Sequence, residues 1–110
     1  MGIAIFDVAA REAYMASFHA AQALLFERHG RVPRKHAGVH SAFAKLCTEE
    51  PGLDRALGRF LADAYNLKQV ADYAPNKALD ADKARQAIDT AATLIAAVEA
   101  ALAPGEGRPA

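Results

Sequence analysis

The chain has 110 residues, which is enough for one domain with one hydrophobic core. Apolar residues make up 53% of it, and alanine supplies almost half of these, so the composition favours helices and excludes a strand-rich fold. The formal net charge is zero, so the overall charge indicates no particular class of partner.

The first predicted helix runs from about Asp7, its expected N-cap, to His29, and Gly30 is the residue expected to end it. Apolar and small residues recur at helical spacing along it and predict one buried face. This face consists of Ala10, Tyr14, Ser17, Ala21 and Leu24 or Leu25. A second ridge of small residues should allow another helix to lie close, and it consists of Ala9, Ala13, Ala16 and Ala20.

Pro33 interrupts the helical pattern in the connection at residues 31–35. A shorter helix is then predicted from His36 or Ala37 to Cys47, with an apolar stripe of Val39, Phe43 and Leu46. After a turn at residues 48–52, a third helix is predicted to end near Tyr73. Its apolar positions are Leu53, Leu57, Phe60, Leu61, Ala64, Leu67 and Ala71.

The last predicted helix follows Asp80, its expected N-cap, and runs to about Ala103. Its predicted packing stripe has heptad spacing, which suits long antiparallel packing, and consists of Ile88, Ala91, Ile95, Val98 and Leu102. Three long helices and one short helix therefore predict an all-α, up-and-down antiparallel helix bundle. We expect this single domain to occupy residues 1–103, with a flexible tail over residues 104–110.

Three features of the sequence predict a cytoplasmic protein without a membrane span. The single cysteine, Cys47, cannot form an intramolecular disulfide and is typical of a small core residue in a reducing compartment. No apolar run approaches the ~18 residues that a membrane span needs. The first residues also lack the basic and long apolar regions of a signal peptide.

Common catalytic and metal-binding signatures are missing from the sequence. It has no P-loop, no glycine-rich dinucleotide turn, no His-Glu-x-x-His motif and no Glu-x-x-His pair. His36 and His40 have the i, i+4 spacing of a helical zinc site, but no third ligand accompanies them, which favours a structural or surface role. We therefore expect neither a metal nor a cofactor.

The segment from Arg28 to Thr48 contains no acidic residue, although it contains five arginines or lysines and three histidines. One interpretation is a solvated basic face beside a helix end. The other is an electrostatic site for the phosphates of RNA or of a nucleotide. The candidate phosphate ligands are Arg34, Lys35, His36 and His40. Aromatic residues are scarce here, so the segment gives little support for base stacking.

The end of the third predicted helix carries a second polar cluster, which consists of Tyr65, Lys68, Gln69, Asp72 and Tyr73. Tyr65, Lys68 and Asp72 share one helix face at i, i+3 and i+7. In one interpretation Lys68 and Asp72 form an i, i+4 ion pair worth a few tenths of a kcal/mol. In the other, polar groups on an otherwise apolar helix mark a site, because burying them without partners is costly.

Three segments of the sequence resemble those of HEPN-domain proteins. Residues 11–28, REAYMASFHAAQALLFER, resemble the R-x-A-Y-Y-A-x-F-H-A-A-x-A-L-L helix of that family. Residues 35–40, KHAGVH, resemble its K-T-H-S-G-V segment, and residues 61–73, LADAYNLKQVADY, resemble its A-Y-x-L-R-x-x-A-D-Y segment. The order is preserved over residues 7–102, so the chain looks like the small stand-alone branch of the family.

The resemblance implies a helical bundle that is commonly dimeric. Many members are toxins that cut RNA without a metal and are encoded beside a nucleotidyltransferase-like antitoxin. Their catalytic motif is an arginine followed after four to six residues by a histidine, near the dimer interface. Related chains usually have a further helix before the segment at Arg11, so this sequence is expected to be a shortened form or a bundle completed by a partner chain.

The sequence departs from that motif. Lys68 stands where the family has its arginine, and Asp72 and Tyr73 stand where catalytic members place histidine. Lysine keeps the positive charge but loses the bidentate fork, and tyrosine, with a pKa near 10, is a poor base at neutral pH. Arg34 and His40 also have the motif spacing, but they lie in another segment, so we interpret that match as accidental.

Two functions follow from these observations. The first is a HEPN-type component of a toxin–antitoxin-like system that acts on or binds RNA, as a metal-independent ribonuclease if it is catalytic. The candidate catalytic residues are then Lys68, which would contact phosphate, with Asp72 and Tyr73. The alternative is a non-catalytic HEPN module that forms a homodimer and binds a nucleotidyltransferase partner or a nucleotide.

Overall fold

The computed structural model describes residues 5–73 and 79–103. The described residues contain four helices, α1 (Ile5–His29), α2 (His36–Glu49), α3 (Ala56–Tyr73) and α4 (Ala81–Leu102), and no strand. The predicted all-α bundle of three long helices and one short helix is therefore confirmed. None of the described helices is both long and apolar enough to cross a membrane. The predicted tail at residues 104–110 lies outside the described residues.

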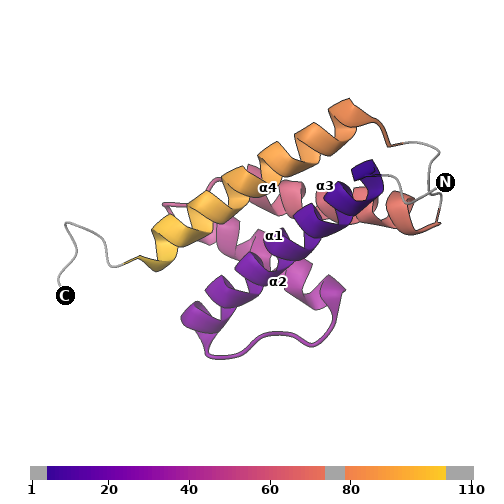
Figure 1. The fold of residues 1–110 in the computed structure, drawn as a ribbon. Helices are drawn as coiled ribbons and strands as arrows, with labels where there is room; N and C mark the ends of the chain where they lie inside the picture. The colour runs from indigo at the N-terminus through magenta and orange to yellow at the C-terminus, as the bar shows by residue number, and fades with distance from the viewer. Residues whose placement is uncertain (1–4, 74–78, 104–110) are drawn as a thin grey trace.

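Helices α1 and α4 lie side by side and run in the same direction (Figure 1). Ala13, in the first half of α1, packs with Ala87 and Ala91 in the first half of α4. Arg28, near the end of α1, donates a hydrogen bond to the carbonyl of Ala101, near the end of α4. The small side chains of the first contact allow the two helices to lie close.

Helix α2 also follows the direction of α1. Tyr14 of α1 contacts His36 at the start of α2, and Arg28 contacts Glu50 at its end. The connection at residues 30–35 therefore carries the chain back along α1 before α2 begins. The predicted alternation in direction holds for α2 with α3 and for α3 with α4, but it does not hold for α1 with α2.

Helix α3 runs against the other three helices and packs tightly on α2. Tyr65 contacts His40, whereas Gly58, earlier in α3, lies against Ala44, later in α2. A Cβ at Gly58 would be 3.0 Å from the Cα of Ala44, so glycine permits this close approach. The third helix begins at Ala56, later than the predicted apolar pattern, and its first turn is capped by the Asp54 carboxylate, which accepts from the Ala56 N–H.

Of the three residues predicted to cap or end a helix, Gly30 and Asp80 are confirmed and Asp7 is wrong. Gly30 has a φ of 77° and its N–H bonds to the carbonyl of Phe26, as expected of the residue that ends α1. Asp80 caps α4 by accepting a hydrogen bond from the Lys83 N–H at 2.9 Å. Asp7 is not an N-cap, because α1 begins at Ile5 and places Asp7, buried, in the first turn.

The predicted core faces of the first three helices are largely confirmed. The buried core residues of these helices include Tyr14, Ala21, Leu24, Leu25, Val39, Phe43, Leu46, Leu57, Leu61 and Ala64. Leu53 is buried just before α3. Cys47 is also buried, as predicted for a core thiol, and this burial raises its pKa to about 11. The thiol is thus protonated at neutral pH and packs as an apolar group.

The predicted packing stripe of α4 is confirmed at Ala91 and Val98 but not at Ile88 and Leu102. The buried residues of α4 are Ala84, Ala87, Ala91, Leu94 and Val98. Ile88, which was expected to face the core, is instead 50% exposed, and Leu102 is 37% exposed. In the first half of α4 alanines face inward, where Ala87 and Ala91 pack closely on Ala13 of α1, whereas Leu94 and Val98 fill the core further along the helix. The small ridge of α1 is correspondingly narrower than predicted, since Ala13 is buried and Ala16 is exposed.

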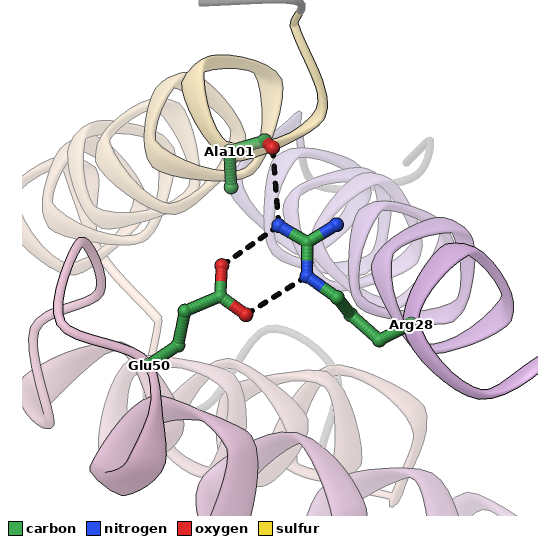
Figure 2. A network of polar contacts seen from close by, with 3 residues as sticks. All are labelled: Arg28, Glu50 and Ala101. Carbon is green, nitrogen blue, oxygen red and sulfur yellow. Dashed lines mark hydrogen bonds and ion pairs between the residues drawn. The ribbon is translucent and has the colours of Figure 1, made fainter. Parts of the chain in front are cut away.

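An ion pair joins the ends of α1 and α2 to α4 (Figure 2). Arg28 donates from Nε to one oxygen of Glu50 at 2.8 Å and from Nη2 to the other at 2.7 Å. The same Nη2 donates to the carbonyl of Ala101 at 3.1 Å. The bond with Glu50 raises the pKa of Arg28 further above its usual value. This Arg28 clamp fixes three chain segments with one guanidinium group.

Candidate functional site

Tyr14 stands at the centre of a polar cluster inside the bundle. Its side chain is fully buried, and its hydroxyl lies 2.8 Å from His36 Nδ1 and 2.9 Å from His40 Nε2. The i, i+4 spacing on α2 turns both rings toward α1. Because the hydroxyl carries one proton, it donates to one ring nitrogen and accepts an N–H from the other. The tautomers of the two histidines are therefore coupled through Tyr14.

Aromatic rings from α1 and α3 fix the orientation of the two imidazoles. His36 stacks on Phe18 with ring centroids 4.2 Å apart and an interplanar angle of 18°. The ring of Tyr65 meets His40 edge-on at 5.3 Å and Tyr14 at 5.3 Å. Such contacts restrict ring rotation. We refer to these five residues as the Tyr14 cluster.

Burial sets the charge state of the Tyr14 cluster. It raises the pKa of Tyr14 far above its usual value, with a further contribution from Tyr65. It also lowers the pKa of His40, and the neighbouring His36 lowers it further. At neutral pH the Tyr14 hydroxyl is thus protonated and His40 is uncharged. His36 is exposed and uses Nδ1 toward Tyr14, so its Nε2 has no partner among the described residues.

Two cations share one carboxylate beside the Tyr14 cluster. Asp72 accepts from Lys68 Nζ at 2.8 Å and from Arg11 Nε at 2.9 Å. These bonds lower the pKa of Asp72, that with Lys68 most, and the same bond raises the pKa of Lys68. Lys68 Nζ also lies 6.0 Å from the centre of the Tyr65 ring. The three charges sum to a single positive charge at the edge of the cluster.

The structure brings together two of the three predicted catalytic residues. Lys68 and Asp72 form the ion pair that their i, i+4 spacing indicated, and Arg11 of α1 joins them. Tyr73, the last residue of α3, is 80% exposed and forms no hydrogen bond with either of them. Its predicted role is not tested by this arrangement.

The four predicted phosphate ligands do not form one group. His36 and His40 belong to the Tyr14 cluster. Arg34 lines a separate groove between the end of α1 and α2. Lys35 is exposed at the N-cap position of α2 and makes no capping bond with its side chain.

Sequence reasoning missed Arg11 and Tyr14 as site residues. Tyr14 was assigned only to the buried face of its helix, although a buried tyrosine hydroxyl usually finds a hydrogen-bond partner. The signal available was the spacing, because Arg11 and Tyr14 are i, i+3 on α1 and so share a face. Over residues 5–73 and 79–103, no three His, Cys, Asp or Glu side chains gather as metal ligands would.

Comparison with known proteins agrees with this fold. The HEPN domain family matches residues 3–101, so the chain belongs to the HEPN-domain family and the resemblance seen in its three segments is confirmed. "Putative toxin MJ0605" of Methanocaldococcus jannaschii is 41% identical over 71 residues, which are 64% of this chain and 52% of that protein. "Putative toxin MJ0142" of the same organism is 37% identical over 68 residues, or 62% of this chain and 46% of that protein.

The chain thus spans about half the length of the curated relatives it matches. No solved structure matches it significantly. Arg11, Tyr14, His36, Lys68 and Asp72 all lie in the three segments that resemble the family.

Proposed function

We propose that this chain is the toxin component of a toxin–antitoxin-like pair and that it acts on RNA at the Tyr14 cluster. Its family and the names of the two relatives from Methanocaldococcus jannaschii support the first part. The observation that carries the second is the 2.8 Å contact between Tyr14 and His36, with Lys68 and Arg11 at the edge of the same cluster. Acting on RNA agrees with a cytoplasmic location.

The geometry suits cleavage of RNA by its own 2′-hydroxyl. With the His36 proton on Nδ1, donated to Tyr14, the Nε2 lone pair is free to remove the proton of a ribose 2′-hydroxyl. The 2′-oxygen then attacks the adjacent phosphorus, and the bond to the 5′-oxygen breaks as this oxygen takes a proton from water, which yields a 2′,3′-cyclic phosphate and a 5′-hydroxyl end. The hydroxide that remains takes the proton back from His36 Nε2. The Tyr14 oxygen accepts the N–H of His36 Nδ1 and so stabilises the imidazolium formed in the first step. The Tyr14 hydroxyl donates to His40 Nε2.

Lys68 and Arg11 would hold the phosphate in this reaction. Both cations face Asp72, so a phosphate must compete with that carboxylate for them. Arg11 uses only Nε toward Asp72, which leaves its terminal nitrogens available for a phosphate. The charge that develops on the phosphate in the transition state is then stabilised by two cations.

The decisive test is cleavage of a labelled single-stranded RNA in EDTA. We expect His36→Gln to lower the rate by about 100-fold or more, as loss of a general base does. The matched control is His19→Gln, which changes an exposed histidine of α1 outside the cluster. Intact RNA with the unmodified protein, or equal rates for His36→Gln and His19→Gln, would contradict the proposal.

Two further variants separate the roles of the charged and exposed residues. Asp72→Asn frees Lys68 and Arg11, so we expect it to bind RNA more tightly than the unmodified protein. Tyr73→Phe tests the predicted catalytic role of Tyr73, and a loss of cleavage in that variant would add Tyr73 to the site.

A second candidate function is a non-catalytic HEPN module that binds a nucleotidyltransferase partner. The sharing of Asp72 by both cations favours it, because the carboxylate already occupies the groups that a phosphate would need. Co-purification with the product of a neighbouring nucleotidyltransferase-like gene, together with RNA that stays intact, would favour this function over cleavage. Failure to co-purify would count against it.

Either function is compatible with a homodimer. Ile88 and Leu102 expose large apolar side chains on α4, as residues at protein interfaces often do. The solution mass of the protein tests this expectation, and Ile88→Lys should shift a dimer toward the monomer. A monomeric mass at micromolar concentration would contradict the expected homodimer for both candidate functions.

A further inference from the structure

A groove of about 1000 Å³ lies between the end of α1, the connection at residues 30–35 and α2. It is separate from the Tyr14 cluster. Apolar side chains form its wall, among them Leu25 and Leu46, which are buried. Cationic side chains surround this wall, among them Arg31 and Arg34. The groove therefore combines an apolar surface with positive charge.

Two of the four lysines and arginines that line the groove, Arg31 and Arg34, are not opposed by a carboxylate of the described residues, although Glu49 also lines it. Arg31 and Arg34 are exposed, and neither forms an ion pair with any residue that the structure describes. Lys45 lies 3.9 Å from Glu49, but both side chains are more than half exposed, so this pair is weak. Arg28 is held in its clamp and contributes to the wall. The groove is thus suited to an anion.

The groove adjoins the Tyr14 cluster at the first turn of α2. Pro33, which lines the groove, lies against Gly38, where a Cβ would be 2.8 Å from the Pro33 Cβ. Arg34 precedes His36 by only two residues. A small anion would occupy one of these two places, whereas an extended polyanion passing the start of α2 would reach both.

We propose that this groove binds the phosphate backbone of the RNA strand next to the nucleotides at the Tyr14 cluster. The inference rests on the proposed function, which supplies RNA as the ligand. Arg31 and Arg34 present planar guanidinium groups that match the geometry of phosphate. The residues that line the groove include His29 but no Phe, Tyr or Trp, so it offers little surface for stacking bases and is suited to contact the backbone.

The test is binding of a fluorescein-labelled oligouridine RNA, measured by fluorescence anisotropy in EDTA at several salt concentrations. All proteins carry His36→Gln so that cleavage does not consume the probe. We expect Arg31→Ala with Arg34→Ala to weaken binding about tenfold. The double substitution should also lower the slope of log K against log salt by about 1.4, because each single-strand phosphate contact contributes about 0.7.

The matched control is Arg59→Ala with Arg85→Ala, which removes the same charge from exposed positions of α3 and α4 outside the groove. We expect it to bind RNA almost as well as the parent protein. Equal losses of RNA affinity in the two double variants would overturn the proposal that the groove binds RNA, because total charge alone would then explain the losses. Circular dichroism checks that both variants keep the helical content of the parent.

The remaining outcomes separate this inference from the proposed function. If the parent protein binds RNA and the groove variant binds it equally well, the proposed role of the groove is overturned and the proposed function stands. If the protein neither binds nor cleaves RNA, both fail. If polyglutamate binds as tightly as RNA and loses affinity in the groove variant, the occupant is an acidic polypeptide and the RNA inference is overturned.

Discussion

Two arginines of α1 each meet a carboxylate, and the two pairs are built differently. Arg28 uses two nitrogens to hold both oxygens of Glu50, and its side chain is 26% exposed. Arg11 uses Nε alone on Asp72, is 36% exposed, and shares that carboxylate with Lys68. The first pair joins three segments of the fold, whereas the second holds the cations that a phosphate would take over in the proposed function. The same residue type thus has a bidentate, more buried pairing at one end of α1 and a single, more exposed bond at the other.

The largest expected effect is that of Arg28→Met on stability. We expect it to lower the free energy of unfolding by about 2 kcal/mol, because two charge-assisted hydrogen bonds and the bond to Ala101 are lost from a partly buried place. Urea denaturation followed by circular dichroism measures the change. Arg31→Met, which removes an exposed arginine without an ion pair, should stay within about 0.5 kcal/mol, and equal losses would refute the clamp.

A smaller loss is expected from Tyr14→Phe. The variant keeps the buried ring but removes the hydroxyl that bridges His36 and His40, which should cost about 1 kcal/mol. The control is Tyr73→Phe, since that side chain is 80% exposed and its hydroxyl has no bridging role. An unchanged urea midpoint in Tyr14→Phe would show that the bridge contributes nothing to the fold.

The pH dependence of stability should report His40. Burial lowers its pKa in the folded state below the usual 6.5, so the unfolded chain binds the proton first as the pH falls. Stability from this residue is complete above about pH 6.5 and is lost as the pH falls through the folded pKa. We expect a lower urea midpoint at pH 5 than at pH 7.5, and a smaller difference in His40→Gln. Asp72 acts in the same direction only near and below 3.8.

The smallest effect on stability should come from Arg11→Ala. Its single hydrogen bond to Asp72 is partly exposed, so we expect a loss below about 0.5 kcal/mol. The same variant should bind labelled RNA more weakly if Arg11 holds phosphate as we propose. A loss of unfolding free energy as large as that of Arg28→Met would show that the two ion pairs contribute equally to stability.

Local spacing predicted the parts of the molecule that depend on neighbours in sequence. The buried face of α1, the cap at Asp80 and the pairing of Lys68 with Asp72 all follow from i, i+3 or i, i+4 relations, and the structure has them. Periodicity predicted the α4 core only in part, because residues at several helical spacings are apolar there, and it placed Ile88 inward. Only the close packing against α1 decides that the alanines face inward and Ile88 faces outward.

Contacts between distant segments could not be read from the sequence. The hydroxyl of Tyr14 meets His36 across 22 residues, and Arg11 meets Asp72 across 61 residues. The first contact depends on α1 and α2 running in the same direction, and the second depends on α3 running against α1. The six residues from Gly30 to Lys35 can span roughly 20 Å when extended, which is enough to carry the chain back along α1. A short connection therefore did not require antiparallel neighbours.

The parallel placement of α1 and α4 has a consequence for folding. The bond from Arg28 to Ala101 closes a loop of 73 residues, so it forms only after most of the chain has been ordered. The Tyr14 cluster needs only α1, α2 and α3. During synthesis the chain can therefore assemble this cluster before α4 packs on α1. The contacts of Ala13 with Ala87 and Ala91 would then form last.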